Sequence, residues 1–137
     1  KAPVRSQIRD EMWVKLWGNL SFNPISALTG STLLEMCSDN DTRELIYNMM
    51  SEAQEIGEKL GAKFAIDINR RIEGGKAVGS HKTSMLQDLE RRRPLEIDAL
   101  IGAVVEMARI TEIPAPNIEA ILALVKLKAS LEGCYPP

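Results

Sequence analysis

The sequence has few aromatic side chains: phenylalanine, tryptophan and tyrosine together make up 4% of its 137 residues. Proteins that bind nucleic acids use such rings to stack bases, and they usually carry a basic surface that neutralises phosphates. Here 17 lysines and arginines stand against 19 aspartates and glutamates, and the formal net charge is −2. We therefore expect no nucleic acid among the partners of this protein.

Cysteine and histidine are also scarce. Cys37 and Cys134 are far apart without a Cys-x-x-Cys spacing, and His81 is the single histidine. This pattern indicates neither a zinc site nor a disulfide framework. We expect no bound metal and two unpaired thiols, which fit a reducing, cytoplasmic location.

Long apolar runs are absent as well. No stretch reaches the roughly 20 residues that a membrane-spanning helix needs, and no signal segment opens the sequence. The chain begins at Lys1, without a methionine, in the middle of a helical pattern. We expect no membrane association and a chain that is a piece of a longer protein.

Helical periodicity, in contrast, runs through almost the whole sequence, with no alternating strand pattern and no internal repeat. At this length one domain is expected, with roughly 70% of the unfolded chain's surface buried on folding. The pattern predicts an all-α, multi-helix bundle. The expected helices cover residues 6–21, a short segment at 33–36, a long one from Asp39 or Asp41 to Leu60, one from Ile66 or Asp67, then 80–92, 95–110 and 117–131.

Several details follow from local signals. Ile8, Met12, Leu16 and Leu20 recur every four residues and predict the core-facing stripe of the first helix. Asn23-Pro24 predicts the end of that helix, with a short turn to Leu28.

Further signals concern the later helices. Gly74-Gly75 predicts a break, and the surrounding segment "EGGKAVGS" is interpreted as a loop. Pro94 fits the first turn of the helix 95–110, the most apolar of the chain, which is therefore expected at the buried centre of the bundle. Asn117 is expected to cap the last helix.

The segment "KLWGNLSFNPISALTG" places three polar residues on one side of the first helix. Lys15, Asn19 and Asn23 are spaced by four residues and fall within an arc of roughly 80°. A solvated polar face explains this spacing. So does a ligand site, in which the ammonium supplies charge and a proton while the amides supply orienting hydrogen bonds. Spacing does not decide between the two.

A second polar cluster lies in "SHKTSMLQDLERRRPLEIDALIGAVV", next to the most apolar helix. It contains Ser84, Gln87, Asp88, Glu96 and Asp98. Glu96 would be the third residue of its helix, where a glutamate complements the helix dipole. Ser84 fits an ordinary helix start. The residues alone leave two interpretations open: Ser84 and Glu96 stabilise helix ends, or they belong to a binding site.

Taken together, the segments "KLWGNLSFNPISALTG", "HKTSMLQDLERRRPLEIDALIG" and "GAVVEMARITEIPAPNIEAILALVKLK" resemble the C-terminal domain of the ketopantoate reductase family, the 2-dehydropantoate 2-reductases. The resemblance covers nearly the whole chain in order. It implies an all-helical domain similar to that of 6-phosphogluconate dehydrogenase. It also implies an enzyme that reduces ketopantoate to pantoate with NADPH, on the route to pantothenate and coenzyme A.

The resemblance also implies roles for single residues. Lys15 matches the general acid of the family, and Asn19, Asn23 and Ser84 match positions that bind substrate. Glu96 matches an acidic residue that contacts the substrate hydroxyl or the cofactor. The chemistry is consistent, since hydride addition leaves negative charge on the keto oxygen, which an ammonium both stabilises and protonates.

A glycine-rich dinucleotide-binding turn of the Gly-x-Gly-x-x-Gly type is not found in this sequence. We therefore interpret residues 1–137 as the helical substrate-binding domain, with the N-terminal NADPH domain missing and the chain alone inactive. Severed from that domain, it is expected to expose Trp13, Trp17, Phe22 and Leu95 and to form a homodimer.

Two alternatives remain. One is a related reductase of another 2-oxo acid, because Leu33 replaces a polar turn residue that some members have. The other is a non-enzymatic helical interaction module that uses residues 95–110 as its partner surface.

Overall fold

The computed structural model describes residues 2–135, and every regular element in that range is helical. This confirms the predicted all-α fold. The elements are α1 (Ala2–Thr29), α2 (Leu33–Ser38), α3 (Asn40–Lys59), α4 (Ile68–Val78), α5 (Ser84–Glu90), the π-helical turn η1 (Asp98–Gly102), α6 (Ala103–Thr111) and α7 (Pro116–Leu131). No helix in the described range is both long and apolar enough to span a bilayer.

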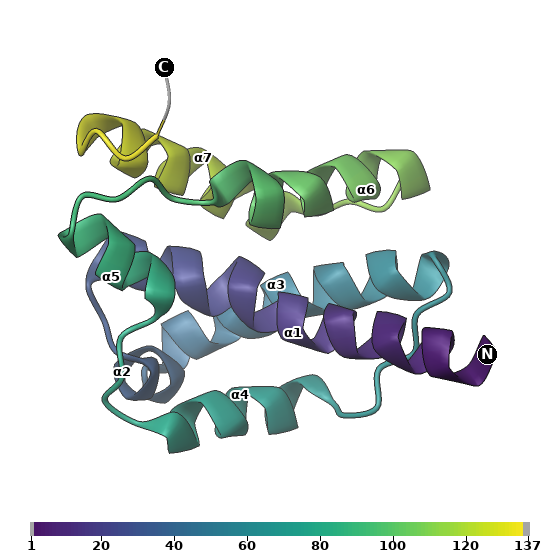
Figure 1. The fold of residues 1–137 in the computed structure, drawn as a ribbon. Helices are drawn as coiled ribbons and strands as arrows, with labels where there is room; N and C mark the ends of the chain where they lie inside the picture. The colour runs from purple at the N-terminus through teal and green to yellow at the C-terminus, as the bar shows by residue number, and fades with distance from the viewer. Residues whose placement is uncertain (1, 136–137) are drawn as a thin grey trace.

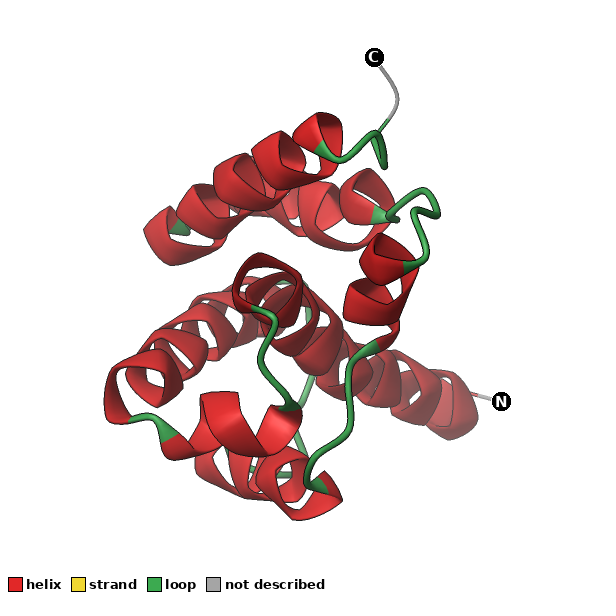
Figure 2. Ribbon diagram, turned by 90° about the vertical axis from the view of Figure 1, so that its left-hand side faces the viewer, coloured by secondary structure: helices red, strands yellow, loops and turns green. Residues whose placement is uncertain are grey.

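The helices form three layers, with α1 and α3 in the middle one (Figure 1). In Figure 1, α6 and α7 lie above α1 and α3, while α2 and α4 lie below them. Figure 2 shows the same arrangement from the side, with α5 connecting the lower part of the molecule to the upper helices. α1 contacts α2, α3, α5, α7 and η1, and α3 contacts α1, α2, α4, α6 and α7, so these two helices form the centre of the fold.

The prediction that Pro24 ends the first helix is wrong. The helix α1 continues through Pro24 to Thr29. A proline removes one backbone hydrogen bond, but tertiary packing compensates here, because Ile25 and Ala27 beyond it are buried in the core. Gly30, with a φ of +75°, ends the helix.

The stripe predicted to face the core from α1 is also wrong at its start. Ile8 is 53% exposed and Met12 is 65% exposed. The buried face instead carries Trp13 and Trp17. The indole Nε1–H of Trp17 donates to the carbonyl of Met50 at 3.0 Å, and its ring stacks on Phe64 with centroids 4.6 Å apart.

Burial of these aromatics corrects a further expectation. Trp13, Trp17, Phe22 and Leu95 all belong to the hydrophobic core instead of an uncovered interdomain face. The domain therefore closes its own core, and the exposed apolar side chains lie elsewhere.

Two predicted helix starts are confirmed by their caps. The Thr32 hydroxyl accepts from the backbone N–H of Glu35, whose carboxylate accepts from Thr32 N–H in return, so the two residues form a capping box. Asp39 caps α3 through its side chain, which accepts from Thr42 N–H. Hydrogen bonds between residues three apart in the sequence are therefore enough to specify both helix starts.

The predicted break at Gly74-Gly75 is wrong, because α4 runs through both residues and ends before Gly79. Gly75 is required by packing. A Cβ atom there would lie 2.8 Å from Cζ of the buried Phe22 ring. The segment interpreted as a loop is therefore mostly a helix, which contacts the Phe22 side chain of α1.

The second half of the chain differs from prediction mainly at helix ends. α5 begins at Ser84 after its cap Thr83, four residues later than expected. Pro94 and Glu96 precede the next helix, which begins at Ile97, passes through the π-helical turn η1 and continues as α6. This helix is buried only in part, since Ile110 is 72% exposed. The last helix begins at Pro116, so Asn117 lies inside α7 and does not cap it.

Candidate functional site

Lys15, Asn19 and Asn23 form one row along α1, and the row is continuous because α1 does not end at Pro24. Lys15 is exposed, while the two asparagines are half-buried. Asn23 Nδ2 donates to Asn19 Oδ1 at 3.5 Å, the long limit of a hydrogen bond. Lys15 makes no ion pair within residues 8–135. The polar groups of the row are therefore available to a ligand.

A hollow of about 420 Å³ lies beside the first part of this row. Lys15 and Asn19 provide its polar groups, and its walls are apolar. The remaining lining residues are Met12, Trp13, Leu16 and Met107. Met107 comes from α6, so residues of two separate helices border the space next to the ammonium group.

A second, smaller hollow of about 110 Å³ lies at the other end of the row. It brings together Asn23, Ser84 and Glu96, which come from three different parts of the chain. Its other lining residues are Met85, Asp88, Pro94 and Leu100. The structure thus places three of the five predicted site residues in one hollow and the other two in the neighbouring hollow on the same helix.

Ser84 is held near α1 by a chain of hydroxyl groups. The Ser26 hydroxyl donates to the carbonyl of Asn23 at 2.8 Å and is hydrogen-bonded to the hydroxyl of Thr83. Thr83 Oγ1 in turn accepts from Leu86 N–H at 3.2 Å, which caps the start of α5. All the hydroxyl groups are buried, so this network fixes the position of Ser84 relative to Asn23.

Glu96 is positioned by the residues on either side of it. Leu95 and Ile97 are buried, and Leu95 N–H donates to the carbonyl of Cys134 at 2.9 Å. Glu96 lies between these two buried residues, and its carboxylate is exposed. The prediction that Glu96 is the third residue of its helix is wrong, because the helix begins after it. Glu96 lies just before η1, and such wider helical turns often occur at functional sites.

Some residues of the site were not singled out from the sequence. Met107 and Leu100 were assigned to the core, and only the tertiary structure shows that they also line the two hollows. Arg71 from α4 lines a third hollow together with Lys15. No local signal connects residue 71 with residue 15, because their proximity depends on how α4 packs on α1.

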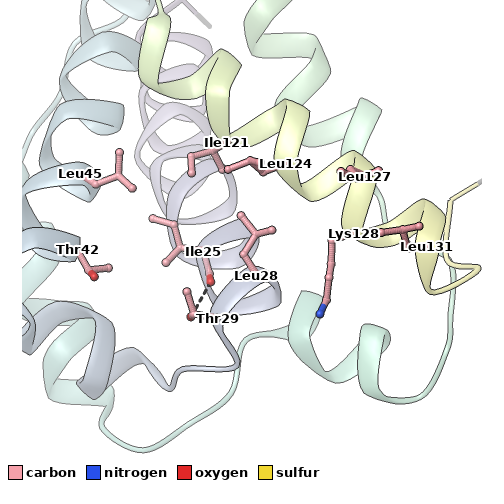
Figure 3. Close-up of a pocket in the computed structure, with 10 residues that line it drawn as sticks. All are labelled: Ile25, Leu28, Thr29, Thr42, Leu45, Ile121, Leu124, Leu127, Lys128 and Leu131. Carbon is pink, nitrogen blue, oxygen red and sulfur yellow. Dashed lines mark hydrogen bonds between the residues drawn. The ribbon is translucent and has the colours of Figure 1, made fainter.

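A fourth hollow, of about 420 Å³, is almost entirely apolar. Figure 3 shows it between the end of α1, the start of α3 and the outer face of α7. The lining residues are Ile25, Leu28, Thr29, Thr42, Leu45, Ile121, Leu124, Leu127, Lys128 and Leu131. The Thr29 hydroxyl already donates to the carbonyl of Ile25 at 2.8 Å. This groove has too few free polar groups for catalysis and resembles a contact surface.

Comparison with known proteins agrees with this geometry. Residues 7–129 match the family described as ketopantoate reductase PanE/ApbA C terminal. The 2-dehydropantoate 2-reductase of Mesorhizobium japonicum is 62% identical over 135 residues, which are 98% of this chain and 41% of that protein. The chain thus spans about two fifths of the length of this curated relative.

Solved structures show the same domain. A candidate ketopantoate reductase from Ralstonia solanacearum superposes with a TM-score of 0.88 and 38% identity, over 93% of this chain and 39% of that one. Two more distant structures share the fold. One is D-mandelate dehydrogenase bound to NADH and anilino(oxo)acetate, with a TM-score of 0.80 and 18% identity over 90% of this chain and 70% of that chain.

The second of these more distant structures is a dimeric ketopantoate reductase from Staphylococcus aureus, with a TM-score of 0.76 and 24% identity over 92% of this chain and 44% of that chain. The fold, the order of the helices and the family match over residues 7–129 agree with one another. The chain therefore belongs to the ketopantoate reductase family, of which it forms the C-terminal domain.

Proposed function

We propose that this chain is the substrate-binding domain of an NADPH-dependent reductase that converts ketopantoate, a 2-oxo acid, into pantoate. The observation that supports this function is the row of Lys15, Asn19 and Asn23 on α1, with Ser84 and Glu96 beside its last member. The relative that is 62% identical is named for this reaction.

Lys15 is the proton donor in this proposal. Reduction of the keto group leaves negative charge on its oxygen, which a neighbouring ammonium stabilises and then protonates. An arginine would stabilise the same charge but would release its proton poorly. The ammonium of Lys15 makes no ion pair within residues 8–135, so no bound carboxylate competes with the substrate.

Asn19, Asn23 and Ser84 orient the substrate. Their groups are neutral, so they form hydrogen bonds with the polar groups of an acid without repelling its charge. The hydrogen bond between the two asparagines is long, at 3.5 Å, and is easily exchanged for one to a ligand. Glu96 accepts a hydrogen bond from a hydroxyl of the substrate or of the cofactor.

The nicotinamide cofactor supplies the hydride and is held mainly by residues outside this chain. The hollow beside Glu96 has a volume of only about 110 Å³, which suits the edge of a ligand and not a whole dinucleotide. An N-terminal dinucleotide-binding domain is the natural source of the remaining contacts. The NADH complex of the distantly related D-mandelate dehydrogenase is consistent with a nicotinamide cofactor.

A homodimer is the proposed assembly, formed through the apolar groove shown in Figure 3. Leu124, Leu127 and Leu131 line the α7 side of this groove and form its exposed ridge, so a two-fold axis would pack the ridge of one copy into the groove of the other. Leu28 in the groove follows Asn19 by about 2.5 helical turns and points to the opposite side of α1. A cofactor domain that covers the row therefore leaves the groove free for a second copy.

The experiment uses the full-length gene product and follows NADPH consumption with ketopantoate. Lys15→Ala is expected to lower kcat by roughly 10²- to 10⁴-fold, which is the usual contribution of general acid catalysis. Lys15→Arg should remain poor, and Lys59→Ala, which removes an exposed lysine at the end of α3, should behave like the wild type. Near-normal turnover of the arginine variant would show that Lys15 does not donate the proton.

A panel of substrates tests the remaining alternative, a reductase of a different 2-oxo acid. The comparison measures kcat/KM for ketopantoate, pyruvate and phenylglyoxylate under the same conditions. The highest value is expected for ketopantoate. A clear preference for one of the others would reassign the substrate, and no turnover of any 2-oxo acid would reject the proposed function.

A further inference from the structure

The third hollow at Lys15 contains a second cation. This hollow has a volume of about 400 Å³ and lies between α1 and the segment that leads into α4. Lys15 and Arg71 both line it, with Val14 and Ile66 as apolar walls. Two positive groups thus border one partly apolar space at the row of site residues.

The guanidinium of Arg71 is held against α1 by two contacts. It lies over the ring of Phe22, with its Cζ 5.1 Å from the ring centroid. Its Nη2 also occupies the space beside Gly18, where a Cβ atom would lie only 2.6 Å away. Position 18 therefore has to be glycine for Arg71 to reach this place without displacement.

This location brings Arg71 close to the site. Residues three and four apart on a helix are neighbours, with Cβ atoms about 5–6 Å apart. Gly18 follows Lys15 by three residues, so these two positions are neighbours on α1. A guanidinium that rests on Gly18 therefore lies about one helical turn from Lys15, with which it lines the third hollow.

Arg71 has no anionic partner in the described part of the chain. It is half-buried, its side chain forms no ion pair with residues 8–135, and it takes part in no side-chain hydrogen bond. Burial lowers the pKa of its guanidinium, which reflects lost hydration. The ring of Phe22 compensates for this loss only in part, because it offers no oxygen acceptor to the five N–H donors, and none of these bonds to a protein acceptor within residues 8–135.

The two acidic residues at the edge of the hollow do not neutralise Arg71. Asp10 Oδ1 accepts a hydrogen bond from the backbone N–H of Lys63 at 2.8 Å. Glu11 is exposed and forms no ion pair with Arg71 or Lys15. Arg71 is therefore paired with neither carboxylate and remains available to an anionic ligand.

We propose that Arg71, held across Gly18, binds the carboxylate of the 2-oxo acid whose keto oxygen faces Lys15. This inference rests on the proposed reductase function. In a 2-oxo acid the carboxylate is bonded directly to the keto carbon, so the groups that recognise the two must lie side by side. A guanidinium binds a carboxylate through two parallel hydrogen bonds and keeps its charge, while the neighbouring ammonium gives up its proton.

The test compares Arg71→Gln and Arg71→Lys with the wild type in the full-length enzyme, at saturating NADPH. Loss of charge-assisted hydrogen bonds is expected to raise KM for ketopantoate by roughly 10- to 100-fold in Arg71→Gln. The effect should be smaller in Arg71→Lys, which keeps the charge. Arg70→Gln is the matched control, because Arg70 is an exposed arginine next in sequence that does not line the hollow.

The carboxamide analogue of ketopantoate provides the decisive comparison. Wild-type enzyme should prefer the acid to the amide, and Arg71→Gln should lose this preference while its melting temperature stays near that of Arg71→Lys. An equal loss for acid and amide would assign Arg71 a purely structural role and overturn the inference. A rise in KM for NADPH alone would also overturn it, because the bound anion would then be a cofactor phosphate.

Gly18→Ala gives an independent test that leaves the arginine in place. The added methyl group should displace the flexible end of Arg71 and raise KM for ketopantoate, with a smaller change for the amide. An unchanged KM would contradict the inference. If the proposed reductase function itself were wrong, the wild-type enzyme would reduce no 2-oxo acid at all. This result is distinct from those that would reject only the role of Arg71.

Discussion

Glu52 on α3 and Asn117 on α7 are joined by two hydrogen bonds to a single carboxylate oxygen. Oε2 of Glu52 accepts from the backbone N–H of Asn117 at 3.0 Å and from its side-chain amide at 2.7 Å, while Oε1 accepts from Ile118 N–H at 3.0 Å. Ala115 and Pro116 at the start of α7 offer no capping side chain. A residue that lies far earlier in the sequence therefore caps this helix.

Glu52→Ala should destabilise the domain, because it leaves two N–H groups at the start of α7 without an acceptor. The expected loss in free energy of unfolding is about 1–3 kcal/mol, as measured by denaturant unfolding. Glu52→Gln should cost less, since one acceptor oxygen remains. Glu55→Ala, which removes an exposed glutamate from the same helix, serves as control. Equal losses for Glu52→Ala and Glu55→Ala would contradict the capping role.

The cap at Asp39 should make stability depend on pH. The hydroxyl of Thr42, at 2.7 Å, and then its backbone N–H lower the pKa of the Asp39 carboxyl. The stabilisation is complete above the pKa of an unfolded aspartate, about 3.9, and is lost as the pH falls through the lower folded value. Asp39→Asn keeps an acceptor but removes the charge.

The comparison follows the melting temperature of both proteins from about pH 7 to about pH 3. The wild type should be the more stable at neutral pH, and its advantage over Asp39→Asn should shrink in the acidic part of this range. Parallel curves over the whole range would show that the charge of Asp39 does not contribute.

The isolated chain of 137 residues should not oxidise NADPH in the presence of ketopantoate. The proposed hydride donor is bound mainly by residues outside this chain, so the reacting groups are not brought together. Nicotinamide absorbance provides the measurement, with the full-length protein as positive control. Sustained turnover by the isolated chain would reveal a cofactor site within it.

The chain should form a dimer of twice its 15.2 kDa mass in light scattering at high micromolar concentration. Leu127→Glu places a charge on the ridge beside the apolar groove and should give a monomer. Met12→Glu alters an exposed side chain at the Lys15 hollow and should leave the dimer intact. The opposite pattern would place the contact at the site, and a mass near 15.2 kDa for the unaltered chain would exclude the dimer.

Local sequence signals predicted the parts of the fold that depend on neighbouring residues. Thr32 with Glu35, and Asp39 with Thr42, form caps whose partners are three residues apart; the first helix start was predicted at Leu33, and of the two predicted starts Asp39 and Asp41 the structure has the cap at Asp39. The wrong predictions concern positions where packing against residues far away in the sequence determines the local conformation. Pro24 remains within α1 because the residues beyond it are buried, and Gly75 remains within α4 because it packs against Phe22.

The candidate site likewise has one part that local sequence signals predict and another that depends on distant residues. Lys15, Asn19 and Asn23 share one helix, so their common face follows from helical geometry alone. Ser84 and Glu96 reach Asn23 through the hydroxyl network of Ser26 and Thr83 and through the anchor at Leu95, neither of which has a periodic signal. Their grouping was suggested by the family resemblance and not by spacing.

The contact between Gly18 and Arg71 also limits how these two positions can change during evolution. An alanine at position 18 is incompatible with the present place of Arg71, since its Cβ would lie 2.6 Å from Nη2. A shorter side chain at position 71 would remove this restriction. Related sequences are therefore expected to covary here, with glycine retained at position 18 wherever an arginine occupies position 71, and larger residues accepted only after the arginine has been lost.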